Sequence, residues 1–525
     1  MASDHAHPPV VFQTHPDRYR HVELSVDGAI ARIALNVQED GGLRPDDYTL
    51  KLNSYDTGVD VELCDAVQRL RFEHPEVACV VITSALQGVF CSGANIFMLG
   101  SSAHAFKVNF CKYTNETRLS IEDASAHSGQ RYIAALNGVA SGGGYELPLA
   151  CEEIYLVDDR RSAVALPEVP FLGVLPGTGG LTRVVDKRKV RRDRADIFST
   201  LAEGIKGRRA VEWGLVDDVF PASSFDDRVL ARAQEIAGAG HAERKGVALP
   251  EISATVGDDG SLRYEFVTVT FGPEDRVAHL TLRAPASLPA VPADARDLGA
   301  SWWPLQAFRE LDEALLQLRF NHLGVGLLLL RTQGDPAVVR ALDEALLSRQ
   351  DDWFVREVTL LMKRVLKRLD MTAKTLFALI EEGSCFVGSL YEIALSADRQ
   401  YQFDEDGVVV GLTGMNFGLL PMGNGLTRLQ TRLLGDPAGL AALEAHTAED
   451  LDASAANDLG LITDAFDDID WEDEIRLVVE ERATMSPDAL TGMEANLRFA
   501  GPETMETKIF GRLTAWQNWI FQRPN

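Results

Sequence analysis

Two glutamates stand in or beside glycine-rich strings, and they are the residues of this chain best suited to chemistry. Glu146 ends the string Gly142-Gly143-Gly144-Tyr145-Glu146, and Glu168 shortly precedes the glycine-rich segment 173–180. Glycines let backbone N–H groups approach a ligand closely, and a nearby carboxylate can accept or deliver protons there. The pattern therefore predicts a pair of glutamates that handles water beside a backbone anion hole.

An internal repeat is the strongest organisational signal in the sequence. Separate blocks of the first half recur in the second half at a spacing of about 246 residues. The matched blocks are Gly144-Tyr145-Glu146-Leu147 with Leu390-Tyr391-Glu392-Ile393, Leu181-Thr182-Arg183 with Leu426-Thr427-Arg428, and Gly214-Leu215-Val216 with Gly460-Leu461-Ile462. A nearly constant offset across several blocks is hard to obtain by chance, so we expect two copies of one fold.

Each copy is predicted to be an α/β domain. Strand-like runs such as Cys79–Thr83 alternate with helix-like segments such as Asp60–Phe72. A passage rich in glycine and polar residues follows the first copy and is typical of a linker. We predict a catalytic domain over 1–240, a linker over 241–262, a second domain over 263–469 and a C-terminal helical region over 470–525.

The composition narrows the class of protein. The formal charge of −27 argues against nucleic acid and anionic membrane surfaces as partners, and no apolar run is long enough to span a bilayer. The first residues lack the basic start and apolar core of a signal peptide. The six cysteines are scattered and show no metal-ligand spacing. We expect a cytoplasmic protein without a metal.

Three ordered motifs give the first half a family resemblance. They are Phe90-Cys91-Ser92-Gly93-Ala94-Asn95-Ile96, Asn137-Gly138 followed by Gly142–Glu146, and Pro167-Glu168 followed by 173–180. In this order they resemble the crotonase (enoyl-CoA hydratase/isomerase) superfamily. The resemblance implies a repeated ββα spiral fold and an acyl-CoA thioester as substrate. It implies no separate cofactor, since coenzyme A is part of the substrate.

The resemblance also implies roles for single residues. The backbone N–H groups of Ser92 and Gly143 would form the oxyanion hole, and Glu146 and Glu168 would be the catalytic carboxylates. Neighbouring residues expected to line the substrate are Cys91, Asn95, Gly142 and Gly144. The superfamily often has aspartate where Asn95 stands. For Glu146 the structural alternative is that it caps or salt-bridges a helix that opens at Gly143.

Two further features have both a functional and a structural interpretation. Cys111 falls in a region that contributes to the acyl pocket in crotonases, yet a free cysteine often behaves as a small buried hydrophobe. The basic run 187–194 would suit the phosphates of CoA, although a solvated surface helix is the more ordinary interpretation.

A narrower resemblance concerns the reaction. Two fused crotonase-like halves, with the segment 51–63, resemble the ring-opening aryl-CoA lyases of this superfamily. That resemblance implies a lyase that converts 2,3-epoxybenzoyl-CoA and two waters to 3,4-didehydroadipyl-CoA semialdehyde and formate, through a thioester enolate. An enoyl-CoA hydratase or isomerase for another acyl-CoA is one alternative. A non-catalytic scaffold that binds CoA esters is the other.

The second copy keeps the repeated sequence blocks but lacks residues that the proposed catalysis needs. Gly143 is matched by Ser389 and Glu168 by Thr413, which leaves Glu392 without a second carboxylate. We therefore predict one active site in each chain, with a degenerate second domain that serves packing and assembly. A homodimer is the expected assembly.

Overall fold

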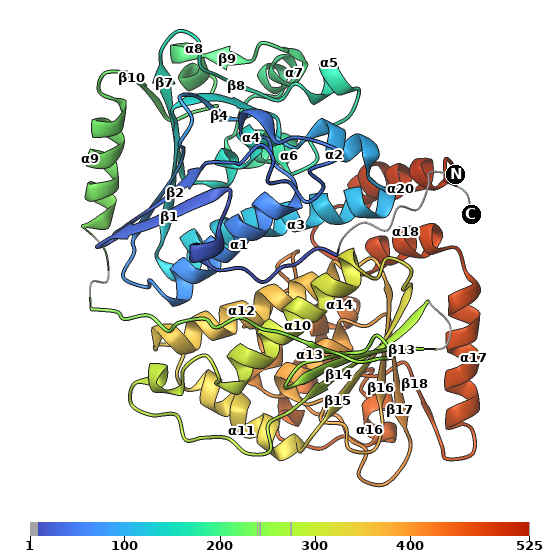
Figure 1. The fold of residues 1–525 in the computed structure, drawn as a ribbon. Coiled ribbons are helices and arrows are strands. Elements are labelled where there is room, and N and C mark those ends of the chain that lie inside the picture. The colour runs from blue at the N-terminus through green and yellow to red at the C-terminus, as the bar shows by residue number, and fades with distance from the viewer. Residues whose placement is uncertain (1–8, 239, 241–242, 273–275, 524–525) are drawn as a thin grey trace. The chain divides into compact units, whose positions relative to one another are not determined.

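The computed structural model describes residues 9–238, 240, 243–272 and 276–523. The chain divides into two compact units, Met1–Glu251 and Ile252–Asn525 (Figure 1). The division falls inside the stretch 241–262 that the sequence predicts to be a linker.

Six strands form the main sheet of the first unit, in the order β1-β2-β3-β5-β7-β10. Their bounds are β1 (Val22–Asp27), β2 (Ile30–Leu35), β3 (Cys79–Ser84), β5 (Arg131–Leu136), β7 (Glu153–Asp158) and β10 (Asp218–Pro221). β1 and β2 are antiparallel, and the other neighbours are parallel. Every residue of β3 is buried, as expected of a central parallel strand that is covered on both faces.

Helices cover both faces of this sheet (Figure 1). Helices α1 (Thr57–Phe72) and α3 (His104–Asp123) share a core with Val80 and Ile82 of β3. Helix α9 (Phe225–Ala237) packs on the other face, against Cys79 and Val81. The split follows from the alternation of side chains along a strand. The remaining helices of the unit are α2 (Ile96–Ser101), α4 (Gly143–Glu146), α5 (Glu168–Leu172), α6 (Gly180–Thr182), α7 (Arg192–Thr200) and α8 (Gly207–Glu212).

A second, four-stranded sheet in the first unit carries the predicted site. Its order is β4-β6-β8-β9, with bounds β4 (Gly88–Cys91), β6 (Gly138–Ser141), β8 (Ala163–Ala165) and β9 (Ile205–Lys206). β4, β6 and β8 are parallel, and β9 runs antiparallel to β8. The carboxyl ends of the three parallel strands therefore meet at one edge of this sheet.

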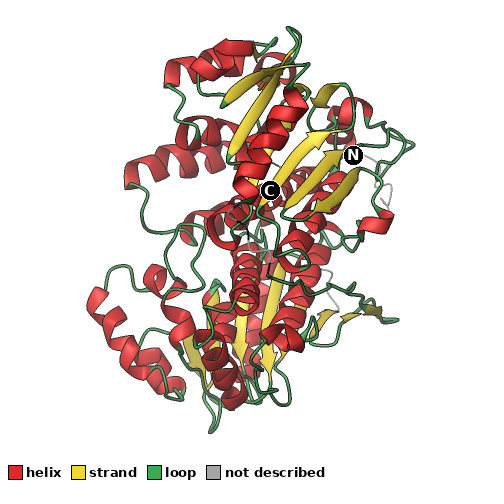
Figure 2. Cartoon of the chain, turned by 90° about the vertical axis from the view of Figure 1, so that its left-hand side faces the viewer, coloured by secondary structure: helices red, strands yellow, loops and turns green. Residues whose placement is uncertain are grey.

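The second unit contains one eight-stranded sheet, in the order β11-β12-β13-β14-β15-β16-β17-β18. The bounds are β11 (Thr255–Val256), β12 (Leu262–Arg263), β13 (Val267–Phe271), β14 (Val277–Arg283), β15 (Leu327–Gln333), β16 (Thr375–Ile380), β17 (Arg399–Phe403) and β18 (Asp464–Phe466). The first four strands are antiparallel to their neighbours, and β14 to β18 are parallel. Figure 2 shows the strands of each unit side by side with helices around them.

The helices of the second unit follow the same order as those of the first. They are α10 (Trp303–Phe320), α11 (Pro336–Leu347), α12 (Trp353–Asp370), α13 (Gly388–Leu395), α14 (Arg428–Arg432), α15 (Pro437–Leu443), α16 (Ala453–Asp458), α17 (Trp471–Thr484), α18 (Pro487–Leu497), α19 (Met505–Lys508) and α20 (Thr514–Ile520). α10 packs against α12, as α1 packs against α3. Apolar side chains of α17 pack on Phe377 and Leu379 of the sheet, as α9 does in the first unit.

Matching hydrogen bonds show that the two units are built alike. The Tyr145 hydroxyl donates to the carbonyl of Leu215 at 2.6 Å, and the Tyr391 hydroxyl donates to that of Leu461 at 2.7 Å. Each pair lies in sequence blocks that repeat between the halves. The structure therefore has the predicted α/β class and the predicted doubling.

No helix within the described ranges is both long enough and apolar enough to cross a membrane.

Candidate active site

Three loops converge at the carboxyl edge of the small sheet. Ser92 follows β4, Gly142 follows β6, and Glu168 lies shortly after β8. The sheet is parallel at these strands, so residues that are far apart in sequence arrive at the same edge. The three sequence motifs thus form one region of the folded unit.

Glycine is required where the loops touch. Gly93 has φ +92°, and a β-carbon there would lie 2.8 Å from the carbonyl oxygen of Ser141 and 2.9 Å from the nitrogen of Gly143. Gly142 has φ +57°, and its β-carbon would lie 2.8 Å from Oε1 of Glu168. A side chain at either position would be strained and would push the loops apart. The glycine string therefore brings Gly143 and Glu168 to the same place.

The two predicted oxyanion donors differ in their surroundings. Gly143 is buried at the start of α4, and its N–H group has no hydrogen-bond partner among the described residues. The Ser92 N–H group donates to the carbonyl oxygen of Leu52 at 3.1 Å. Leu52 has φ 58°, an unusual conformation for a residue with a side chain. In this conformation the open donor is Gly143, and Ser92 is already engaged.

Glu146 is buried and held by a loop. Its Oε1 accepts hydrogen bonds from the N–H groups of Thr178 and Gly180, at 3.0 and 2.7 Å. Its Oε2 accepts one from the Thr178 hydroxyl. A β-carbon on Gly180 would lie 2.8 Å from Oε1, so the loop has closed tightly around the carboxylate. All these donors are uncharged, and no described residue forms an ion pair with Glu146, so uncharged groups fix its orientation.

Glu168 has a contrasting environment. It is half-buried at the start of α5, and its buried Oε2 has no hydrogen-bond partner among the described residues. Burial, together with the smaller effect of the charge of Glu146, raises the pKa of Glu168 to about 7. Two carboxyl groups in unlike environments can hold one proton between them near neutral pH.

A buried arginine lies beneath the Gly143 turn. Nη2 of Arg118 donates to the carbonyl oxygen of Gly143 at 3.0 Å and to the Tyr55 hydroxyl at 3.1 Å. The side chain of Asp60 is buried nearby, where burial raises the pKa of Asp60 to about 6 against the lowering effect of Arg118. Sequence reasoning missed these residues, because no local motif marks them.

Cys111 lies at the same site. It is half-buried in α3, and a β-carbon on Gly177 would lie 3.3 Å from its sulfur. Burial, together with the smaller effect of the charge of Glu146, raises the pKa of Cys111 to about 11. The thiol is therefore protonated at neutral pH. It is suited to line the site as an uncharged side chain and not to act as a thiolate nucleophile.

The other predicted substrate-lining residues contact the protein. The Cys91 thiol donates to the carbonyl oxygen of Asn53 at 2.9 Å, and a β-carbon on Gly144 would lie 2.1 Å from the Cys91 carbonyl oxygen. Asn95 caps α2, where Oδ1 accepts from the N–H groups of Phe97 and Met98. An aspartate could form the same cap, but it could not donate as Nδ2 of Asn95 does to the carbonyl oxygen of Thr49, at 2.7 Å.

The basic run is largely engaged in local contacts. Lys187 pairs with Glu122, and Arg188 pairs with Asp217. Arg191 pairs with Asp193 at the surface. Lys189 and Arg192 make no ion pair within the described part of the chain. These contacts favour the structural interpretation of the run.

The anion site of the second unit is filled by the protein itself. Ser389, which matches Gly143, donates its N–H to Oδ2 of Asp343 at 2.8 Å. The Thr413 hydroxyl, at the position of Glu168, donates to the same oxygen at 2.7 Å. Asp343 comes from α11 and is fully buried. A carboxylate thus occupies the place where the first unit offers an open N–H group.

Glu392 is bound in a salt bridge. Nη1 of Arg428 lies 2.7 Å from Oε2 of Glu392, and the Asn416 side chain donates to Oε1 at 2.7 Å. Both carboxylate oxygens are occupied, and the side chain is buried. The structural interpretation of this position, an ion pair beside a helix, describes Glu392.

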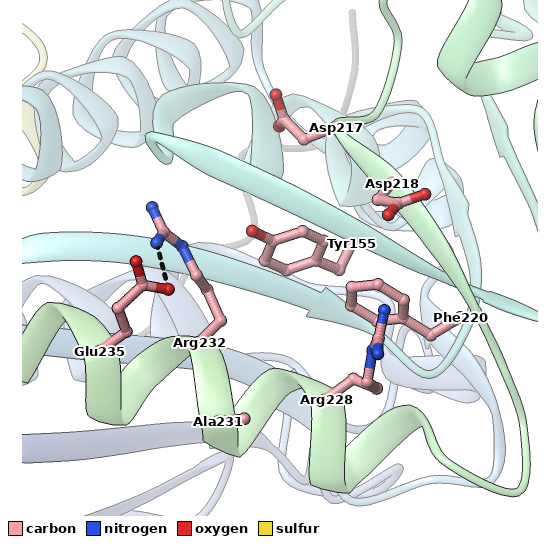
Figure 3. Close-up of a pocket in the computed structure, with 8 residues that line it drawn as sticks. All are labelled: Tyr155, Asp217, Asp218, Phe220, Arg228, Ala231, Arg232 and Glu235. Carbon is pink, nitrogen blue, oxygen red and sulfur yellow. Dashed lines mark ion pairs between the residues drawn. The ribbon is translucent and has the colours of Figure 1, made fainter.

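One surface hollow of about 480 Å³ lies elsewhere in the first unit (Figure 3). Its charged side chains are mostly paired with one another or with neighbours. The Tyr155 hydroxyl donates to Glu153 at 2.5 Å, Arg232 pairs with Glu235 at 2.7 Å, and Arg228 lies over the ring of Phe220. We assign it no function. Over the described ranges, no group of three or more His, Cys, Asp or Glu side chains is arranged to hold a metal ion.

Comparisons with known proteins agree with this picture. The family model described as enoyl-CoA hydratase/isomerase matches residues 48–248. The benzoyl-CoA-dihydrodiol lyase of Aromatoleum evansii is 56% identical over 521 residues, which is 98% of this chain and 94% of that protein. A fatty acid oxidation complex subunit alpha from Shewanella loihica is 33% identical over 180 residues, 34% of this chain and 24% of that protein.

Among solved structures, an enoyl-CoA hydratase of Geobacillus kaustophilus is 33% identical, covers 42% of this chain and 75% of its own, and has a TM-score of 0.37.

The identity to the Aromatoleum protein extends through both units, and the family model falls on the unit that carries the glutamate pair. The chain is therefore an enzyme of the enoyl-CoA hydratase/isomerase (crotonase) family, and it belongs with the lyases of that family.

Proposed function

We propose that this enzyme opens the ring of 2,3-epoxybenzoyl-CoA. Two waters are consumed, and the products are 3,4-didehydroadipyl-CoA semialdehyde and formate. The observation that carries the proposal is the pair of unlike glutamates, Glu146 and Glu168, beside the open N–H group of Gly143. The name of the relative that matches 98% of the chain supports the choice of substrate.

The oxyanion hole would act on the thioester carbonyl. As negative charge develops on that oxygen, the Gly143 N–H group stabilises it more than it stabilises the ground state, and one such donor is worth about 3–4 kcal/mol of barrier. We propose Ser92 as the second donor, and this requires that its N–H be shared between Leu52 and the thioester oxygen. Enolate formation at the thioester then becomes accessible.

The glutamates would divide the proton transfers. Glu146, whose donors suit an ionised carboxylate, takes a proton from the attacking water. Glu168, which is protonated up to about pH 7, delivers a proton to the oxygen of the opening epoxide. The protonation states of the pair are then exchanged, and the second water addition restores them.

Apolar side chains beside the site suit an aryl group. They are exposed on two segments that follow the Ser92 and Glu168 loops: Ile96, Phe97, Val169, Phe171, Leu172, Val174 and Leu175. Exposed apolar side chains that gather around polar groups often mark a ligand site. We propose that this rim receives the ring, with CoA extending away from the glutamates.

A product assay tests the assignment. Purified enzyme is incubated with 2,3-epoxybenzoyl-CoA, and formate and the semialdehyde are detected by mass spectrometry. Release of both in equal amounts is expected. Good turnover of crotonyl-CoA without formate from the epoxide would establish an ordinary hydratase instead.

We also propose a cytoplasmic homodimer that needs no metal or redox cofactor. The six free cysteines are compatible with a reducing compartment. Proton transfer by carboxylates and stabilisation by N–H groups account for the proposed chemistry without a further group.

A further inference from the structure

Arg183 and Arg428 occupy matching positions in the two units and hold a carboxylate in the same way. Nε and Nη2 of Arg183 donate to Glu122, at the end of α3, at 2.9 and 3.0 Å. Nε and Nη2 of Arg428 donate to Asp370, at the end of α12, at 3.1 and 2.7 Å. In both units this fork fixes the plane of the guanidinium.

The remaining nitrogen of each arginine binds a different group. Nη1 of Arg428 forms an ion pair with Glu392, at 2.7 Å, and also donates to the carbonyl oxygen of Leu420, at 3.1 Å. Nη1 of Arg183 donates to the carbonyl oxygen of Thr178, at 3.1 Å, and forms no ion pair with Glu146 among the described residues. Thr178 in turn gives its N–H and hydroxyl to Glu146. In the first unit one loop residue therefore stands between the arginine and the glutamate.

We propose that Arg183 is a positioning residue for Glu146. Anchored by Glu122, its guanidinium holds the Thr178 carbonyl and so turns the N–H and hydroxyl of that residue toward Glu146. The inference rests on the proposed role of Glu146 as a base.

The arrangement matters because of charge. A direct ion pair, as at Glu392, would place a positive charge against the carboxylate and favour its ionised form, whereas the groups that donate hydrogen bonds to Glu146 carry no charge. Other charged or titratable groups that interact with Glu146 are Glu168, Arg118, Tyr55 and Cys111. Glu122 also binds Lys187, at 3.1 Å, so Arg183 and Lys187 share one carboxylate.

Glu122→Gln removes the charge that anchors Arg183. The freed guanidinium is expected to pair with Glu146, so the acidic limb of the kcat/KM profile moves to lower pH. At pH values on the plateau, kcat/KM is expected to fall by no more than about tenfold, because a weaker base takes the proton from water more slowly. In the double variant Glu122→Gln/Arg183→Met the freed guanidinium is absent and the nearby Arg118 is unchanged, so the limb is expected to return to its wild-type position.

Two further variants separate this from a loss of stability. Asp123→Asn, next to Glu122, breaks the ion pair with Arg71 and is expected to leave the pH profile in place. Arg183→Met removes the anchor of Thr178, so the loop is expected to open more often. Amide hydrogen exchange in peptides covering 177–180 should then accelerate about tenfold. The exchange readout does not depend on activity.

The possible results are distinct. An acidic limb of Glu122→Gln that superimposes on the wild type contradicts the proposal, as does unchanged exchange in Arg183→Met. If Glu122→Gln does not fold, the exchange result decides alone. Full turnover by Glu146→Gln would defeat the proposed function instead, and the exchange measurement would still report whether Arg183 holds the loop.

Discussion

At the scale of residues, the two glutamates differ because different groups face them. Glu146 is enclosed by the N–H groups and hydroxyl of the loop at Thr178 and Gly180. Glu168 has a buried oxygen without a partner among the described residues and feels the charge of Glu146. The same side chain is thereby suited to accept protons at one position and to deliver them at the other.

The pH dependence of turnover should report Glu168. Its pKa is raised to about 7, so the protonated form that delivers a proton is lost as the pH rises through about 7. We expect kcat/KM on 2,3-epoxybenzoyl-CoA to fall above that pH with a slope near one proton. Glu168→Gln should lose roughly 10²–10⁴-fold in rate and this limb with it. An unchanged alkaline limb in the variant would assign it to another group.

Cys111 should prove unreactive toward alkylation. Because the pKa of the thiol is raised to about 11, little thiolate is present at neutral pH. Iodoacetamide at pH 7 is expected to modify Cys111 more slowly than a free cysteine in a peptide, and Cys111→Ser should lower kcat by less than about tenfold, since a wall residue gives no covalent step. Rapid, inactivating modification of this single thiol would support a nucleophile.

The motif residues were predictable because they are local. The glycine strings and both glutamates could be identified from sequence, and the structure brings Gly143, Glu146 and Glu168 into one region. The hydrogen bond from the Ser92 N–H group to the Leu52 carbonyl could not be predicted, because it depends on the backbone conformation of a separate loop. The internal repeat singles out Arg183 in the sequence. The contact of its Nη1 with the carbonyl oxygen of Thr178 depends on how that loop folds, so it could not be predicted.

At the scale of elements, the site depends on parallel strands and on the helices beneath them. β4, β6 and β8 deliver the three loops, and α3 supplies a buried arginine under the turn. The strands could be expected from apolar runs, whereas the short β8 and the arginine contact could not. A three-residue strand and a single long-range hydrogen bond leave little periodic signal in sequence.

Removal of the buried arginine should destabilise the first unit. Arg118→Met leaves Asp60 buried without its opposing charge and frees the carbonyl of Gly143, so we expect the free energy of unfolding to fall by about 3–5 kcal/mol. Asp60→Asn added to Arg118→Met should recover part of the loss. Urea denaturation measures both variants. A change below about 1 kcal/mol in Arg118→Met would show that the charge is unimportant.

At the scale of the whole molecule, the same main-sheet fold occurs twice, with different side chains at the matching sites. The order of the main sheet from β1 to β10 recurs in the order from β13 to β18, and the tyrosine hydrogen bonds recur as well. In the second unit Asp343 fills the anion site and Arg428 binds Glu392, while the first unit leaves the corresponding groups available. The absence of a second catalytic carboxylate could be predicted from Ser389 and Thr413. The carboxylate that fills the site could not, because Asp343 comes from α11, where no sequence motif marks it.

The proposed homodimer has a direct test. Size-exclusion chromatography with light scattering should give twice the chain mass of 57.5 kDa. The high negative charge makes electrostatic repulsion between chains strong, so the mass should be measured at physiological salt and at low salt. A mass of one chain at micromolar concentration under both conditions would contradict the assembly.

One paired substitution tests whether the doubled chain holds a single working pair of glutamates. Glu146→Gln and Glu392→Gln make the same change at matching positions, and formate release from 2,3-epoxybenzoyl-CoA is measured for both beside the wild type. We expect Glu146→Gln to lose at least about 10²-fold in turnover while remaining folded. Glu392→Gln should keep turnover within about twofold and lose stability, because it breaks a buried ion pair. Full turnover by Glu146→Gln, or loss of turnover by a folded Glu392→Gln, would show that the working carboxylates are not the pair in the first unit.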